Sequence, residues 1–310
     1  MTEDAARRRQ QGTAYGFLAY LIWGVFPFYF VTLRPAGPWE ILSHRIIWTL
    51  VVCGILLLLA RDFRWLLQLA RTPRRLAGVM LAGGLIAVNW GMYTYAVLTG
   101  HVTEAALGYF MNPLFTVGLG VLILRERLRR LQWVAVGVGA VAAIYLTIDY
   151  GHPPWISLTL ATSFALYSLL KNRLGVSLSP VRTLFGESLA ILPIAIGILI
   201  WLDVTGGTTW GGHGALHTGL LMSTGIATAI PLLLFAAAAS RVPLSTIGLL
   251  QFVAPVLQLT SGIVMGETMA LSRWIGFGIV WVALVVLSVD MVRQVRRARR
   301  QRKDLIDPAP

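Results

Sequence analysis

Ten long apolar runs constrain the fold of this 310-residue chain more than any other feature of its sequence. A helix needs about 20 mostly apolar residues to cross a hydrocarbon core about 30 Å thick. Runs of about this length cover residues 12–33, 38–60, 76–98, 105–124, 131–148, 154–170, 181–202, 216–239, 244–265 and 274–292. They predict an all-α polytopic membrane protein with ten transmembrane helices and no room for a folded soluble domain.

Composition excludes the main alternatives. Hydrophobic residues make up 56% of the chain and charged residues 13%, whereas about a quarter of a soluble domain is charged. A water-soluble enzyme and a disordered chain are therefore excluded. The runs are continuous and do not alternate, which argues against a β-barrel. Cys53 is the single cysteine, so neither an intramolecular disulfide nor a cysteine-based zinc site is expected.

Lys and Arg residues fall almost entirely on one side of the ten-helix arrangement. Twenty-two of them precede the first run, lie in the connections after the second, fourth, sixth and eighth runs, or follow the last run. The opposite side holds Arg34 and Arg273. Because cytoplasmic loops carry the excess of Lys and Arg, this bias predicts a multi-pass protein of the cytoplasmic membrane with both termini in the cytoplasm. Residues 1–11 then form a cytoplasmic N-tail, and residues 293–310 form a basic tail that we expect to contact lipid headgroups rather than nucleic acid.

The chain repeats itself at a distance of 141 or 142 residues. The matched pairs are Glu126 and Glu267, Trp133 and Trp274, Gly137 and Gly278, Asp149 and Asp290, Pro113 and Pro255, and Pro38 and Pro180. The repeats are residues 12–149 and 154–292, with five helices each. Because five is odd, the second copy enters the membrane from the opposite side. Inverted repeats of this kind are typical of secondary transporters, whose substrate site lies near the bilayer midplane.

Four sequence strings extend the comparison to a known family. They are Glu-Ile-Leu-Ser-His-Arg-Ile-Ile-Trp at 40–48, Gly-His-Val-Thr-Glu-Ala-Ala-Leu-Gly-Tyr-Phe-Met-Asn-Pro at 100–113, Leu-Arg-Glu-Arg-Leu-Arg-Arg-Leu-Gln-Trp at 124–133 and Pro-Leu-Ser-Thr-Ile-Gly-Leu-Leu-Gln at 243–251. With them, the chain resembles the EamA branch of the drug/metabolite transporter superfamily over nearly all its spans. The resemblance implies ten helices in two EamA repeats, a cytoplasmic-membrane location, and export or uptake of small metabolites.

Five charged or titratable residues inside the spans are the candidates for coupling or gating: Glu40, His44, Arg45, Arg182 and Glu187. An ionised side chain at the bilayer centre costs about 2.5–3.5 kcal/mol on insertion scales, so each needs a favourable environment. The repeat aligns Glu40 with Arg182 and Arg45 with Glu187. At 1.5 Å per residue, Arg45 and Glu187 are separated by about 10 Å along the membrane normal. Either Arg45 extends to the outer surface and Glu187 bonds a local partner, or the two form a coupling or gating pair.

Amide and aromatic side chains inside the spans are the candidates for substrate binding: Trp23, Asn89, Tyr93, Asn112, Tyr167, Gln251 and Gln258. Gln251, Pro255 and Gln258 are spaced to share one helix face. Proline kinks a helix and frees backbone polar groups, so Asn112-Pro113 and Pro255 mark expected kinks. Cavity lining suits a neutral or zwitterionic metabolite. Helix packing, or anchoring of aromatic residues at the membrane interfaces, is the alternative.

Together these patterns predict a secondary active transporter of small metabolites or drugs that works by alternating access. Proton coupling is expected, with Glu187 or His44 taking up the proton, and export is favoured over uptake. The expected partners are the small-molecule substrate, protons and membrane lipids, and association into homodimers is left open.

No enzyme activity, cofactor or metal is predicted. His213 and His217 lie four residues apart, but a metal would need a third ligand and Asp203 is the nearest acid. Motifs for ATP binding and for the common hydrolases are absent from the sequence. The alternatives are an intramembrane enzyme acting on a lipid-linked substrate, and an uncoupled channel or scramblase.

Overall fold

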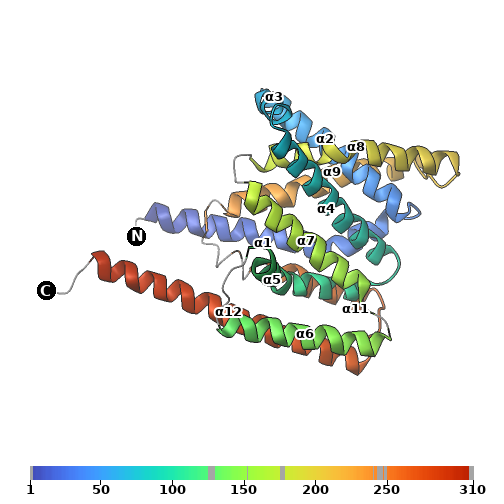
Figure 1. Ribbon diagram of the computed structural model, residues 1–310. Coiled ribbons are helices and arrows are strands. Elements are labelled where there is room, and N and C mark those ends of the chain that lie inside the picture. Colours follow the sequence, from blue (N-terminus) through green and yellow to red (C-terminus); the bar gives the residue numbers. More distant parts are fainter. Residues whose placement is uncertain are drawn as a thin grey trace.

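A computed structural model describes residues 3–124, 130–151, 153–174, 179–239, 241–242, 247 and 250–306. Helices form nearly all of this part of the chain (Figure 1). Their bounds are α1 Glu3–Thr32, α2 Pro38–Leu59, α3 Arg64–Ala70, α4 Pro73–Leu98, α5 Val102–Leu124, α6 Arg130–Tyr150, α7 Trp155–Leu174, α8 Pro180–Val204, α9 Gly214–Ala239, α11 Val253–Val264 and α12 Leu271–Ile306. The start of α1 and the end of α12 lie at one end of the bundle, on the left in Figure 1, and the α8–α9 connection lies at the opposite end.

The helices form a polytopic membrane protein, as the sequence predicts. In the described ranges, eight are long and apolar enough to cross a membrane, while the apolar part of α7, Trp155–Leu170, and α11 are shorter. Each of the ten predicted runs overlaps one of these ten helices. Large apolar side chains point away from the bundle, among them Leu59, Leu122 and Ile148, which are 76–78% exposed. Such a surface is stable only in contact with lipid.

The structure adds two helix extensions and one short helix to the predicted runs. Helix α1 begins nine residues before position 12, at Glu3, and α12 continues past 292 to Ile306. Their polar extensions are rich in Arg, Gln and Ala, which favour helix without needing an apolar environment. Helix α3 was not predicted, because its seven residues are too few to span; it buries Trp65 and Leu69 one turn apart. The repeat residue Glu126 lies outside the described residues.

Helix ends follow local chemistry. Proline occupies the first position of α2, α4 and α8, where its missing N–H would have no helical partner. Helix α4 ends at Leu98, and Gly100 two residues later has φ of 75°. The His101 N–H donates to the Ala96 carbonyl at 2.8 Å. This left-handed ending satisfies carbonyl groups that the helix leaves free.

The two expected proline kinks have different outcomes. Pro113 lies inside the continuous helix α5. A turn at Gln251 and Phe252 interrupts the helical structure before α11. Pro255 therefore lies in the first turn of α11, where proline is tolerated. Gln251 is therefore not on the same helix as Gln258, so the prediction of one shared helix face is wrong.

Helix packing is symmetric under exchange of the two halves. The equivalent helices are α1 and α7, α2 and α8, α4 and α9, α5 and α11, and α6 and α12. Helix α5 packs on α7 as α11 packs on α1; α2 packs on α9 as α8 packs on α4; and α1 packs on α9 as α7 packs on α4. Three further contacts join equivalent helices directly, namely α2 with α8, α5 with α11, and α6 with α12.

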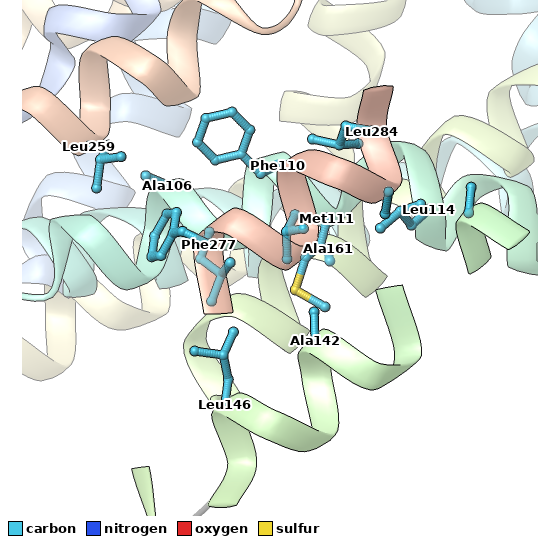
Figure 2. Close-up of a cluster of buried hydrophobic side chains, with 14 residues drawn as sticks. Ala106, Phe110, Met111, Leu114, Ala142, Leu146, Ala161, Leu259, Phe277 and Leu284 are labelled. Carbon is cyan, nitrogen blue, oxygen red and sulfur yellow. The ribbon is translucent and has the colours of Figure 1, made fainter. Parts of the chain in front are cut away.

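The largest hydrophobic cluster holds α5, α6 and α12 together (Figure 2). Phe110, Met111 and Leu114 of α5 meet Leu146 of α6 and Phe277 of α12. Glycines bring these helices close together. A Cβ atom at Gly139 would approach Leu114 to 2.7 Å, and one at Gly276 would approach Leu146 to 2.4 Å. Gly137 and Gly278, which the repeat aligns, have no such neighbour within 4 Å among the described residues.

Candidate functional site

Arg45 lies in the protein interior, where α1, α2, α4 and α9 meet. Its side chain is 4% exposed, and its Nε donates to Thr228 Oγ1 of α9 at 2.9 Å. The guanidinium lies 4.2 Å from the ring centroid of Trp90 and 5.6 Å and 5.8 Å from those of Phe30 and Phe26. A desolvated cation–π contact contributes about 2 kcal/mol, whereas burying an ion costs several kcal/mol. The rings thus offset only part of the cost of this charge.

No carboxylate in the described part of the chain pairs with Arg45. The groups that act on it electrostatically are the phenols of Tyr29, Tyr93 and Tyr109. Its Nη1 is buried without a hydrogen-bond partner among the described residues, and so is the Tyr93 hydroxyl. Arg45 neither extends to the surface nor pairs with Glu187, so of the two alternatives only the local partner of Glu187 is found.

Asn89 joins three helices beside this site. Its Nδ2 donates to the Leu160 carbonyl and to Ser163 Oγ of α7, both at 3.1 Å. Its Oδ1 accepts from the Tyr109 hydroxyl of α5 at 3.2 Å. Tyr109 in turn packs edge-on against Tyr93, with ring centroids 5.6 Å apart. Asn89 and Tyr93, two predicted binding residues, therefore belong to the surroundings of Arg45.

Glu40 binds the segment that follows α8. Its carboxylate has no exposed surface, and it accepts from the N–H of Thr209 at 2.8 Å and of Trp210 at 3.1 Å. The hydroxyls of Thr208 and Thr209 donate to it at 3.1 Å and 2.9 Å. We call these contacts the Glu40 clasp. These four hydrogen bonds satisfy the carboxylate without a cation.

His44 lies one turn along α2 from the Glu40 clasp. Its ring stacks on Trp210, with centroids 4.6 Å apart and planes at 22°. Both ring nitrogens are buried and have no hydrogen-bond partner among the described residues. The stacked pair holds the 208–210 segment against α2 beside Arg45.

Arg182 makes the corresponding contact in the second half. Its Nε and Nη2 donate to the two carboxylate oxygens of Asp62, at 2.7 Å and 2.6 Å. Asp62 follows the end of α2, and Arg182 is the third residue of α8. We call this ion pair the Arg182 clasp. Both side chains are about 30% exposed, so Arg182 lies near the surface at the start of α8.

The two clasps lie at opposite ends of the packed helices α2 and α8. Each helix holds, near its own N-terminus, the segment that follows the C-terminus of the other. Helix α2 has 22 residues, so at 1.5 Å per residue the clasps are about 33 Å apart. That distance is the thickness of a membrane core.

Glu187 meets a partner on α7. The Tyr167 hydroxyl donates to Glu187 Oε2 at 3.1 Å, and the carboxylate is 2% exposed. The Glu187 backbone carbonyl lies against Gly83 of α4, where a Cβ atom would approach it to 2.8 Å. Two predicted residues, Glu187 and Tyr167, are thus brought together in the second half of the chain.

Four predicted binding residues remain. Gln258 and Trp23 are joined by a hydrogen bond, and Asn112 and Gln251 lie apart from that contact. Gln258 Nε2 donates to the Trp23 carbonyl of α1 at 3.1 Å, while Gln258 Oε1 is buried and unpaired in the described structure. Asn112 Oδ1 is likewise buried and unpaired there. Gln251 is half-buried in the turn before α11.

Sequence reasoning missed four contributors: Asp62, Thr209, Tyr109 and Thr228. Asp62 is the one acid in an arginine-rich connection, and Thr228 is a hydroxyl residue within an apolar run. Both could therefore have been identified as candidates from the sequence. Within the described residues, no group of three His, Cys, Asp or Glu side chains could hold a metal ion.

A bundle of apolar helices with buried charges at its centre is the architecture of a polytopic membrane transporter. Residues 10–148 match the profile of the EamA-like transporter family. The protein RarD of Streptomyces exfoliatus is 48% identical over 93% of this chain and 91% of its own. The uncharacterized transporter YojE of Bacillus subtilis is 38% identical over 92% and 95%. The chain belongs to the EamA-like transporter family and groups with its RarD proteins.

A solved crystal structure has the same fold, with a TM-score of 0.60 over 91% of this chain and 98% of that one. At 19% identity, the likeness concerns the fold alone.

Proposed function

We propose that this protein is a secondary active transporter of small metabolites or drugs, working by alternating access between two inverted five-helix repeats, residues 12–149 and 154–292. The observation that carries the proposal is the pair of clasps at opposite ends of α2 and α8. Opening one end requires only one clasp to break, while the other keeps its end closed. The exchange symmetry of the helix contacts and the transporter names of the relatives support the same conclusion.

In this mechanism the buried polar residues between the clasps contact the substrate. Arg45, Asn89 and Tyr93 form the central group. The group continues toward the termini with Trp23 and Gln258, with Tyr167 and Glu187, and with Asn112 and Gln251. Conformational exchange moves α2 and α8 relative to one another, as in transporters whose two halves rock around a fixed site. Protons and membrane lipids are the other proposed partners, export is the favoured direction, and association into homodimers stays open.

Proton coupling is expected to depend on Glu187 or His44, two of the buried groups that can take up and release a proton in this interior. An untargeted comparison of metabolites inside and outside cells with and without the protein identifies a substrate for vesicle assays. Collapsing the pH gradient should reduce its accumulation, and Glu187→Gln should abolish that pH dependence while downhill exchange continues.

Asp203→Asn is the matched control, because it makes the same acid-to-amide change at an exposed position of α8. Its accumulation should respond to the gradient as the wild type does. Full concentrative transport by the double variant His44→Ala and Glu187→Gln would remove both residues from the coupling mechanism.

The membrane orientation gives a separate prediction. Reporter fusions placed after residue 101 or after residue 211 should report the outer side, and a fusion after Lys303 should report the cytoplasm, because Lys and Arg are concentrated on the side of the termini. Alkaline phosphatase and fluorescent-protein activities measure this. A cytoplasmic signal at residue 211 would contradict both the ten-helix topology and the inverted repeat.

A further inference from the structure

We infer that Arg45 and Tyr93 recognise a carboxylate group, so that the substrate is a small carboxylate-bearing metabolite with an apolar or aromatic body. This inference rests on the proposed transport function and adds the chemical class of its substrate.

The first support is an uncompensated buried charge. Arg45 is 4% exposed, and no carboxylate of the described residues lies within ion-pair distance. Buried charges in proteins are normally paired. Four acids of the described residues are buried, namely Glu40, Glu104, Glu187 and Asp290, and none of them forms an ion pair with Arg45. Glu40 is held in its clasp, and Glu187 accepts from Tyr167. An anion arriving with the substrate would supply the missing partner.

The second support is a pair of buried hydrogen-bond donors that have no acceptor among the described residues. Of the three tyrosines around Arg45, Tyr29 bonds Ser223 at 2.8 Å and Tyr109 bonds Asn89 at 3.2 Å. Tyr93 alone of the three has a buried hydroxyl with no partner among the described residues, and Arg45 Nη1 is in the same condition. A carboxylate accepts several hydrogen bonds at once, so one group could satisfy both donors.

The third support is the character and place of the surroundings. Phe26, Phe30 and Trp90 face the guanidinium, which suits an apolar or aromatic body beside the carboxylate. Arg45 belongs to the first half of the chain and its hydrogen-bond partner Thr228 to the second. The site therefore lies between the repeats, where secondary transporters bind their substrates. A cationic substrate would be repelled here.

The test is ligand-dependent thermal stability of the full-length protein purified in detergent. The probes are 3-phenylpropionate, phenylalanine and phenylalaninamide, which share an aromatic body and differ in carboxylate and ammonium groups. We expect 3-phenylpropionate, phenylalanine or both to raise Tm, and phenylalaninamide to leave it unchanged. A response to 3-phenylpropionate alone would assign organic acids, and a response that requires the ammonium group would assign amino acids.

Two variants locate the interaction. Arg45→Gln and Tyr93→Phe should each weaken binding of the active carboxylate at least tenfold, while Arg34→Gln, at an exposed arginine, should not. Without ligand, the Tm of Arg45→Gln should be no lower than that of the wild type, because the variant removes an unpaired buried charge. A merely structural arginine would give the opposite result, a lower Tm without ligand.

The inference is overturned if neither carboxylate raises Tm more than phenylalaninamide does, or if Arg45→Gln and Tyr93→Phe bind as the wild type does. Counterflow in proteoliposomes tests transport separately. Carboxylate binding without counterflow would contradict the proposed transport function and leave the recognition site standing. Counterflow that depends neither on a carboxylate in the substrate nor on Arg45 would support the transport function and contradict the recognition site.

Discussion

Glu40→Ala is expected to release the 208–210 segment and expose the interior beneath it. The change removes the acceptor for the Thr209 and Trp210 N–H groups. Each hydrogen bond to a charged group contributes about 1.5–3 kcal/mol, so losing even one should raise the open population about tenfold or more. Ser43 is fully buried one turn from Glu40, and Ser43→Cys in a Cys53→Ala chain provides a single thiol. Its labelling by a membrane-impermeant maleimide should become at least tenfold faster.

The Arg182 clasp provides the control for this experiment. Asp62→Ala breaks the contact at the other end of α2 and should not increase labelling at position 43. Glu40→Gln keeps one carbonyl oxygen for the two N–H groups and should lie between wild type and Glu40→Ala. Equal labelling rates for wild type and Glu40→Ala would contradict a closing role for the Glu40 clasp.

Gly225→Ala is expected to remove most of the folded protein from the membrane. Helices α2 and α9 approach so closely here that an added Cβ atom would lie 2.3 Å from the Trp48 carbonyl and 2.8 Å from the Thr49 nitrogen. These are backbone atoms, so no side-chain rotation relieves the contact and the helices must separate. Overpacking typically costs about 1–3 kcal/mol, and a backbone contact this short should reach the upper end. Membrane abundance and Tm in detergent measure the effect.

Gly219→Ala is the matched control on the same helix. Gly219 is exposed and has no neighbour within 4 Å of an added Cβ atom, so its abundance and Tm should equal those of the wild type. A Gly225→Ala protein with normal abundance and Tm would show that α2 and α9 are not held at this distance.

The sequence predicted the candidate site unevenly. It identified Glu40, Arg45, Arg182 and Glu187 as charges that need an explanation, because the cost of a charge in an apolar span can be stated without a structure. It did not identify their partners. The alignment of the repeats left open a pair of Arg45 with Glu187, whereas Arg45 bonds Thr228 and Glu187 accepts from Tyr167. Arg182 binds Asp62, and Glu40 binds backbone N–H groups.

The sequence by itself determined the apolar spans, and it predicted the side on which Lys and Arg lie and the repeat of five helices. Spans and orientation depend on residues near one another in the chain, because membrane insertion depends on local hydropathy and flanking charge. Tertiary structure decided which side chains meet. Arg45 and Thr228 are 183 residues apart in sequence, Glu40 and Thr209 are 169 apart, and Asp62 and Arg182 are 120 apart. Whether such residues touch depends on how each helix is rotated and how closely helices approach. Helix rotation and the distance between helices cannot be read from local periodicity, because long-range contacts such as that of Gly225 with the Trp48 backbone determine them.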